Sequence, residues 1–153
     1  MERKDQWTKL LFYAVLLFML SSLVLYAYLG TFTRYMADDY CSAAALKDNG
    51  FWGAQIHWWQ AWSGRYSFTF IISIAELFGL GIVPILPTLI LSFWVFGIVW
   101  VCLPFLKQGK ISNPIPAGIY IAVVVLWSTY RSVDDYPEIA FWQTGLLTYQ
   151  VGS

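Results

Sequence analysis

The chain has 153 residues, of which 59% are hydrophobic, 20% are aromatic and only 12% are charged. Soluble domains carry about 25% charged residues, so this chain has too few polar side chains to cover a soluble core. Its apolar surface needs lipid or a large partner. Nine basic and nine acidic side chains cancel, and no basic cluster indicates a nucleic-acid partner.

The first predicted element is a membrane span over residues 10–29, where LLFYAVLLFMLSSLVLYAYL contains no charge. As a helix these residues would extend about 30 Å, the thickness of a hydrocarbon core. Basic residues in the lead, residues 1–9, predict a cytoplasmic N-terminus. The run is longer than the apolar part of a signal peptide and no A-x-A-like site follows it, so we expect an uncleaved anchor.

Residues 30–65 form the longest polar stretch and are predicted to be an external loop. Within this loop, Trp52, Ile56 and Trp59 recur at helical spacing in the sequence FWGAQIHWWQAW. Tryptophan prefers the headgroup zone of a bilayer, where its ring is half buried and its N–H stays wet. We therefore expect a Trp-rich helix lying along the membrane surface. Sugar stacking by some of these rings is the alternative.

Three more apolar segments follow in the chain. Residues 66–83 contain Glu76 and are closed by two prolines, whereas residues 88–106 and 115–130 are uncharged and predicted to span the membrane. A polar tail covers residues 131–153. The chain is therefore predicted to be all-α, a single transmembrane module with three to four transmembrane helices.

Whether residues 66–83 cross the bilayer decides the predicted topology. A full crossing would place Lys107 and Lys110 outside, against the positive-inside bias. A short, re-entrant or surface-lying segment would make both lysines cytoplasmic and return the tail to the external face. A glutamate at mid-bilayer costs a few kcal/mol, on the order of 3, so Glu76 favours the second topology.

The acidic pair Asp38 and Asp39 follows the first span by about nine residues and is the strongest candidate for chemistry. Adjacent carboxylates on a helix point to different sides, so one can act as a general base while the other orients it or holds a divalent cation such as Mg²⁺ or Mn²⁺. Both residues are therefore candidate catalytic residues and metal ligands. An ordinary solvated acidic pair in a loop is the alternative.

Two further polar groups lie at predicted membrane boundaries. Arg65 lies in the sequence WSGRY, and its guanidinium could bind a substrate phosphate or the lipid headgroups. Asp134, Asp135 and Glu138 precede the sequence FWQTG at 141–145. These three carboxylates could bind a divalent cation or steer a polar substrate, or they could simply end a span.

These motifs together resemble the N-terminal part of polytopic glycosyltransferases of the GT-C type, or of related bacterial membrane families of unassigned function. The resemblance rests on residues 37–41 (ADDYC), on residues 63–66 (SGRY) and on residues 141–145 (FWQTG) with Tyr149. It covers most of the chain, but the motifs are short.

The resemblance implies a transferase in a bacterial plasma membrane that moves a sugar from a polyprenyl-phosphate donor to an acceptor at the external face, with inversion. Asp38 or Asp39 would be the base, and Arg65 would steady the departing lipid phosphate. The other residues implied in substrate binding are Tyr40, Trp142, Gly145 and Tyr149. Such enzymes have many more spans. The chain is therefore expected to be an N-terminal fragment, or a naturally short relative with a partner chain, and to be inactive alone.

Two other functions fit the same residues. The chain could be a non-catalytic membrane subunit or scaffold held by its aromatic surfaces. It could also be part of a transporter that uses Glu76 as an ion site inside the membrane.

Overall fold

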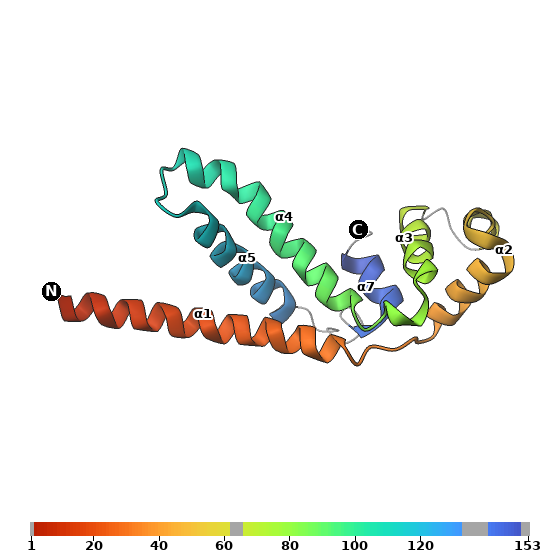
Figure 1. The fold of residues 1–153 in the computed structure, drawn as a ribbon, viewed down its shortest axis with the longest axis horizontal. Coiled ribbons are helices and arrows are strands. Elements are labelled where there is room, and N and C mark those ends of the chain that lie inside the picture. Colours follow the sequence, from red (N-terminus) through yellow and green to blue (C-terminus); the bar gives the residue numbers. More distant parts are fainter. Residues whose placement is uncertain (1, 62–65, 133–140, 151–153) are drawn as a thin grey trace. The chain divides into compact units, whose positions relative to one another are not determined.

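The computed structural model describes residues 2–61, 66–132 and 141–150, and this part of the chain is all-helical, as predicted (Figure 1). In chain order the elements are α1 (Glu2–Gly30), α2 (Asp38–Ala61), α3 (Tyr66–Leu77), the 3₁₀ turn η1 (Gly79–Gly81), α4 (Leu86–Gln108), α5 (Pro114–Arg131) and α7 (Gln143–Gln150). They divide into two compact units. Unit 1 comprises residues 1–27 and 91–134, and unit 2 comprises residues 28–90 and 135–153.

Among the described residues, two helices are long and apolar enough to cross a membrane: Leu10–Gly30 of α1 and all of α4. Only 6% of each apolar window is buried in the protein, so most of these side chains need a covering supplied by something else. Both agree closely with predicted spans, at 10–29 and 88–106. The predicted span 115–130 falls on α5, an eighteen-residue helix that begins with Pro114, where a proline costs no helical hydrogen bond. Helix α5 is not among the candidate spanning helices, so this third span stays a prediction.

Unit 1 packs the C-terminal half of α5 against α1. Leu23 of α1 is buried with Val123 and Leu126 of α5, and side chains of α4 cover the same cluster. Aromatic rings continue the contact along both helices, with ring centroids 4.8 Å apart for Phe12 and Tyr120. The described side chains of this cluster are almost entirely apolar, so unit 1 supplies apolar packing and few groups for chemistry.

Unit 2 surrounds a second core made by α3, α4 and α7. Its buried members are Ile72, Ala75, Leu86, Ile90, Leu146 and Leu147. Helix α2 joins this core through Gln55, whose amide donates to Ser73 Oγ at 2.8 Å and accepts from Thr69 Oγ1 at 3.1 Å. Since these contacts are polar and inter-helical, they fix the rotation of α2 against α3.

Helix α2 occupies most of the predicted external loop and bends at Gly50. The backbone there has φ of 69°, a conformation that glycine adopts without a steric penalty. Beyond the bend, Trp52, Ile56 and Trp59 are all exposed, while Ala54 is buried. The predicted apolar face of the Trp-rich segment is therefore present on a helix; its position at a membrane surface stays a prediction.

The close approach of Gly30 to Pro87 joins the end of α1 to the beginning of α4 within unit 2. A Cβ added at Gly30 would lie 2.6 Å from Pro87 Cβ, so a larger residue does not fit without movement. Between these two residues, α3 ends at Leu77, and the predicted apolar segment 66–83 is completed by η1 and a turn. Twelve helical residues extend about 18 Å, too short for a hydrocarbon core of about 30 Å.

Candidate functional site

The candidate site lies in unit 2, where the beginning of α2 meets α3 and α7. Asp39 is completely buried, with 0% exposure, and its carboxylate accepts three hydrogen bonds. One comes from its own helix start: the Met36 N–H donates to Oδ2 at 2.9 Å, much as the third residue of a capping box bonds back to the start of a helix. Ala37, with φ of 40°, makes the turn between them.

The other two donors to Asp39 come from Thr144, far along the chain. Its backbone N–H lies 2.9 Å from Oδ1, and its hydroxyl donates to the same oxygen. Hydrogen bonds to a carboxylate are roughly twice as strong as neutral ones, and they offset part of the cost of burying the charge. Asp39 therefore fixes α7 to the start of α2.

Three consecutive residues, 142–144, each bind a different part of unit 2, and we call them the clamp. Trp142 Nε1 donates to the Met36 carbonyl at 3.2 Å, and Gln143 Nε2 donates to Glu76 Oε1 at 2.7 Å. Thr144 binds Asp39 as described above. Leu146 and Leu147, one turn later, enter the core of unit 2. The clamp thus holds together α2, α3 and the segment 31–37 between α1 and α2, which we call the connector.

Glu76 is the second buried carboxylate, with 7% exposure. It accepts hydrogen bonds from the Tyr35 hydroxyl and from Gln143, one at each oxygen. Burial raises the pKa of Glu76 above its usual range, the charge of Asp39 raises it further, and the two hydrogen bonds oppose the rise. Burial and the adjacent Glu76 also raise the pKa of Tyr35.

In the part of unit 2 that the structure describes, two buried side-chain oxygens have no hydrogen-bond partner: Gln143 Oε1 and Thr33 Oγ1. The amide of Gln143 is 1% exposed, so its position is set by the single hydrogen bond that Nε2 makes to Glu76. Buried polar groups are normally paired. The hydrogen bond to Glu76 is what pairs the buried amide of Gln143.

Asp38 differs sharply from its neighbour. It is half-buried at the first residue of α2 and makes no hydrogen bond or ion pair with the described residues. Its oxygens therefore have no hydrogen-bond partner among the described residues, and we call this carboxylate open, whereas the oxygens of Asp39 are engaged by three donors. The structure separates the two acids into an open group and a buried, fixed group.

The other predicted site residues are distributed as follows. Tyr40 is 62% exposed, and its ring packs edge-on against Tyr35 with centroids 5.5 Å apart. Trp142 belongs to the clamp, and Gly145 is buried in α7. Arg65, the side chain of Tyr149 and the acidic residues 134, 135 and 138 lie outside the described residues.

Tyr35 at this site lies outside every motif taken from the sequence, and Gln143 and Thr144 belong to the FWQTG motif but were given no role of their own. The usable signal was Glu76, an acid in an apolar segment, which needs polar partners wherever it is buried. Glu76 lies in α3 and not in either helix that is long enough to cross a membrane. This weakens the transporter hypothesis, which places it at mid-bilayer.

A metal site at the acidic pair would depend mainly on Asp38. The described residues contain no group of three or more His, Cys, Asp or Glu side chains placed to hold a metal, and the Asp39 oxygens already accept three hydrogen bonds. Mg²⁺ is commonly held by one or two carboxylates together with substrate phosphates and water. Asp38 is thus the described carboxylate that could take this part.

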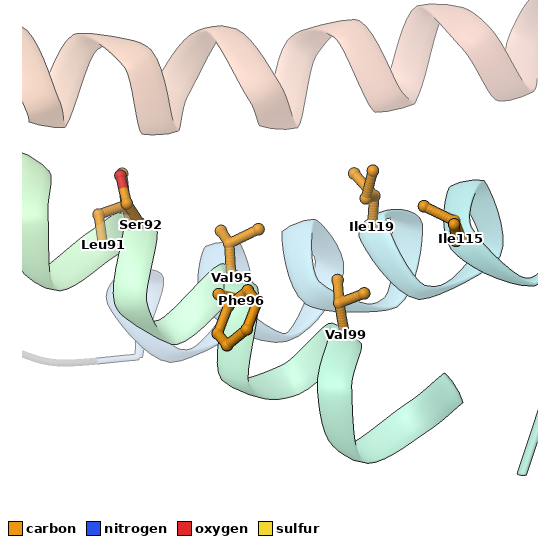
Figure 2. A pocket seen from close by; sticks show the side chains of 7 residues that line it. All are labelled: Leu91, Ser92, Val95, Phe96, Val99, Ile115 and Ile119. Carbon is orange, nitrogen blue, oxygen red and sulfur yellow. The ribbon is translucent and has the colours of Figure 1, made fainter. Parts of the chain in front are cut away.

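A separate apolar groove lies in unit 1 between α4 and α5 (Figure 2). Its volume is about 370 Å³, and it is lined by Leu91, Ser92, Val95, Phe96, Val99, Ile115 and Ile119. Ser92 is its sole polar lining residue. The groove could hold hydrocarbon, but none of its lining side chains is titratable, so the clamp region remains the candidate site.

Comparison with known proteins adds no family: no family model matches the chain, and neither a curated protein nor a solved structure is similar to it. The functional argument therefore depends on the geometry of unit 2 and on the residue pattern.

Proposed function

We propose that the chain is the membrane module of a glycosyltransferase, which transfers a sugar from a polyprenyl-phosphate donor to an acceptor hydroxyl at the external membrane face. The observation that carries the proposal is the open carboxylate of Asp38, held beside the buried Asp39 by the clamp. Two motifs that carry the resemblance, residues 37–41 and 141–145, meet in this one site. Nothing in their sequence separation required them to meet.

In this proposal α1, α4 and α5 cross the membrane, so that the clamp, which follows α5 in the chain, returns to the face that holds Asp39. Since Gly30 lies against Pro87, residues 31–85 stay at one face, and α3 is too short to cross alone. The two lysines after α4, Lys107 and Lys110, then share the opposite, cytoplasmic face with the basic lead, in agreement with the positive-inside bias. Lipid covers the exposed faces of these spans.

The proposed external position also suits the aromatic face of α2. Trp52, Ile56 and Trp59 are exposed on the outside of the helix, while Gln55 holds α3 on the inside. Half-buried indole rings are typical of the headgroup zone. In this position α2 would hold the site at the membrane surface, within reach of a donor whose tail stays in lipid.

The proposed reaction is an inverting displacement. Asp38 accepts the proton of the acceptor hydroxyl. At the same time the oxygen of that hydroxyl attacks the anomeric carbon of the sugar, on the face opposite the leaving group. The bond from that carbon to the phosphate oxygen breaks, and the lipid phosphate departs with the electron pair. Arg65 would pair with the negative charge that develops there. Asp39 and the clamp keep Asp38 in position and do not exchange a proton.

Asp38→Asn, in the protein expressed from its complete reading frame, tests this function. We expect transfer from polyprenyl-phosphate-linked sugars in membrane vesicles to fall by about 10²- to 10⁴-fold, since the base is lost. Asp48→Asn is the matched control, because Asp48 is an exposed acid on the same helix, and it should leave the rate unchanged. Transfer by the Asp38 variant at the control's rate would refute the assigned role.

The alternative proposal, a non-catalytic membrane subunit, is favoured by the aromatic side chains exposed along α4. These include Phe93, Phe96, Trp100 and Phe105, and aromatic residues are enriched at protein interfaces. This function predicts that the chain co-purifies with a larger membrane protein in stoichiometric amount, and that Asp38→Asn leaves both assembly and cellular function intact.

A further inference from the structure

Four segments of unit 2 converge on two buried carboxylates: the connector after α1, the start of α2, the end of α3 and the clamp. Asp39 binds the clamp through Thr144, and Glu76 binds it through Gln143, the adjacent residue. Tyr35, in the connector, donates to the other Glu76 oxygen. The two carboxylates are thus linked both through the clamp and through the connector.

We propose that Glu76 is a positioning residue for the Asp38–Asp39 pair, acting through Gln143 and the clamp. The proposal deepens the proposed function and rests on it for the reaction that is positioned. Its structural part concerns unit 2 alone and can be measured without activity.

Gln143 depends on Glu76 for its one hydrogen bond in the buried interior. Its side chain is 1% exposed, Oε1 has no partner, and Nε2 bonds to Glu76 at 2.7 Å. Removing the Glu76 carboxylate would leave a completely unpaired buried amide, and such a group seeks water. Gln143 is the first residue of α7, so its exposure to water would displace the beginning of that helix.

Displacement of this helix start acts directly on Asp39. Thr144 follows Gln143 in the chain and supplies two of the three donors to the Asp39 carboxylate. Without them, only the Met36 N–H would remain, and the first turn of α2, which carries Asp38, would lose its anchor. Displacements of about 1 Å can reduce catalytic rates about 10²-fold.

The side chains that face Glu76 support a specific link between Glu76 and the clamp through Gln143. Tyr35 faces it from the connector, Gln143 from α7 and Asp39 from α2. Tyr35 and Asp39 are the titratable members, and neither is a cation. Glu76 therefore acts through neutral donors, and a matched exchange of its carboxylate with the Gln143 amide preserves the contact.

Hydrogen–deuterium exchange of the full chain in detergent micelles tests the link, read on peptides covering residues 33–40 and 141–148. Glu76→Ala should accelerate exchange of the Met36 and Thr144 amides together by on the order of tenfold, because both donate to Asp39. If Glu76→Ala fails to fold, Gln143→Ala removes the same hydrogen bond from the other partner. Exchange of the Met36 and Thr144 amides should accelerate by the same amount in that variant.

Two matched variants make the test specific. Gln55→Ala removes another inter-helical contact of α3, a partly buried one, without touching the clamp, so both peptides should exchange as in the wild type. The exchanged pair Glu76→Gln with Gln143→Glu restores one carboxylate facing one amide, and should return exchange to within about threefold of the wild type. A merely structural role of residue 76 would give no such rescue.

In the transferase assay, Glu76→Ala should lower kcat about 10²-fold with KM for the donor little changed, and the exchanged pair should recover most of the rate. The positioning role would be overturned if the Met36 and Thr144 amides of Glu76→Ala exchanged at the wild-type rate. It would also be overturned if Gln55→Ala accelerated their exchange as much as Glu76→Ala does. Absence of transfer by the wild-type protein, with the exchange results as expected, would instead refute the proposed function and leave the link between Glu76 and Asp39 standing.

Discussion

The two buried carboxylates, Asp39 and Glu76, and the donors that bind them form what we call the buried hub. The Thr144 hydroxyl offers the sharpest test of this hub. Thr144→Val keeps the side-chain shape and the backbone N–H, but it removes one of three donors to the completely buried Asp39. Hydrogen bonds to a charged group contribute about 1.5–3 kcal/mol, and a buried acceptor that loses its donor costs at least as much. We therefore expect the free energy of unfolding to fall by about 2 kcal/mol.

Thermal unfolding in detergent micelles measures this loss. For a chain of this size, 1 kcal/mol corresponds to about 2–4 °C, so the Thr144→Val midpoint should fall by about 4–8 °C. Thr148→Val is the matched control on the same helix, since its hydroxyl bonds only to the Thr144 carbonyl at 2.6 Å. The control should fall by less than about 2 °C. Equal shifts in both variants would refute the idea that Asp39 holds the clamp.

Two more predictions concern other parts of unit 2. Gly30→Ala should destabilise the protein by about 1–3 kcal/mol, because the new Cβ meets Pro87. Gly97→Ala is the control and should not destabilise it, since a Cβ at Gly97 meets open space. Equal unfolding midpoints of the two variants would contradict the close approach of Gly30 to Pro87. The raised pKa of Glu76 means that the folded state binds more protons than the unfolded state above the usual value of 4.5. The free energy of unfolding should therefore decline as pH rises from 4.5 toward the raised pKa. Unfolding midpoints measured over a series of pH values should show a weaker decline in Glu76→Gln. The same dependence on pH in this variant and in the wild type would contradict the burial of the Glu76 charge.

Much of the helical framework could be predicted because local composition determines it. The uncharged run 10–29 and the run 88–106 each match a candidate spanning helix within two residues at either end. Proline marks the start of α5 as expected. The bend at Gly50 was not predicted, since an isolated glycine inside a polar stretch does not distinguish a helix with a bend from an ordinary loop.

The candidate site could be predicted only in outline. The acidic pair was identified from the sequence, but which member is buried depends on Thr144, 105 positions away. The partners of Glu76 lie 41 and 67 positions from it. Local pattern gives no information about contacts at such separations, so Glu76 was interpreted as an isolated acid. The arrangement of the hub is a property of the tertiary structure.

The separation of Asp39 from Thr144 has a consequence for the order in which the protein matures. During synthesis α2 emerges well before α7, and until Thr144 leaves the ribosome the Asp39 carboxylate has the Met36 amide as its one donor from the hub. Water must meanwhile satisfy the remaining lone pairs, so the start of α2 stays hydrated while α4 and α5 are made. The acidic pair reaches its final geometry only after both of those helices exist.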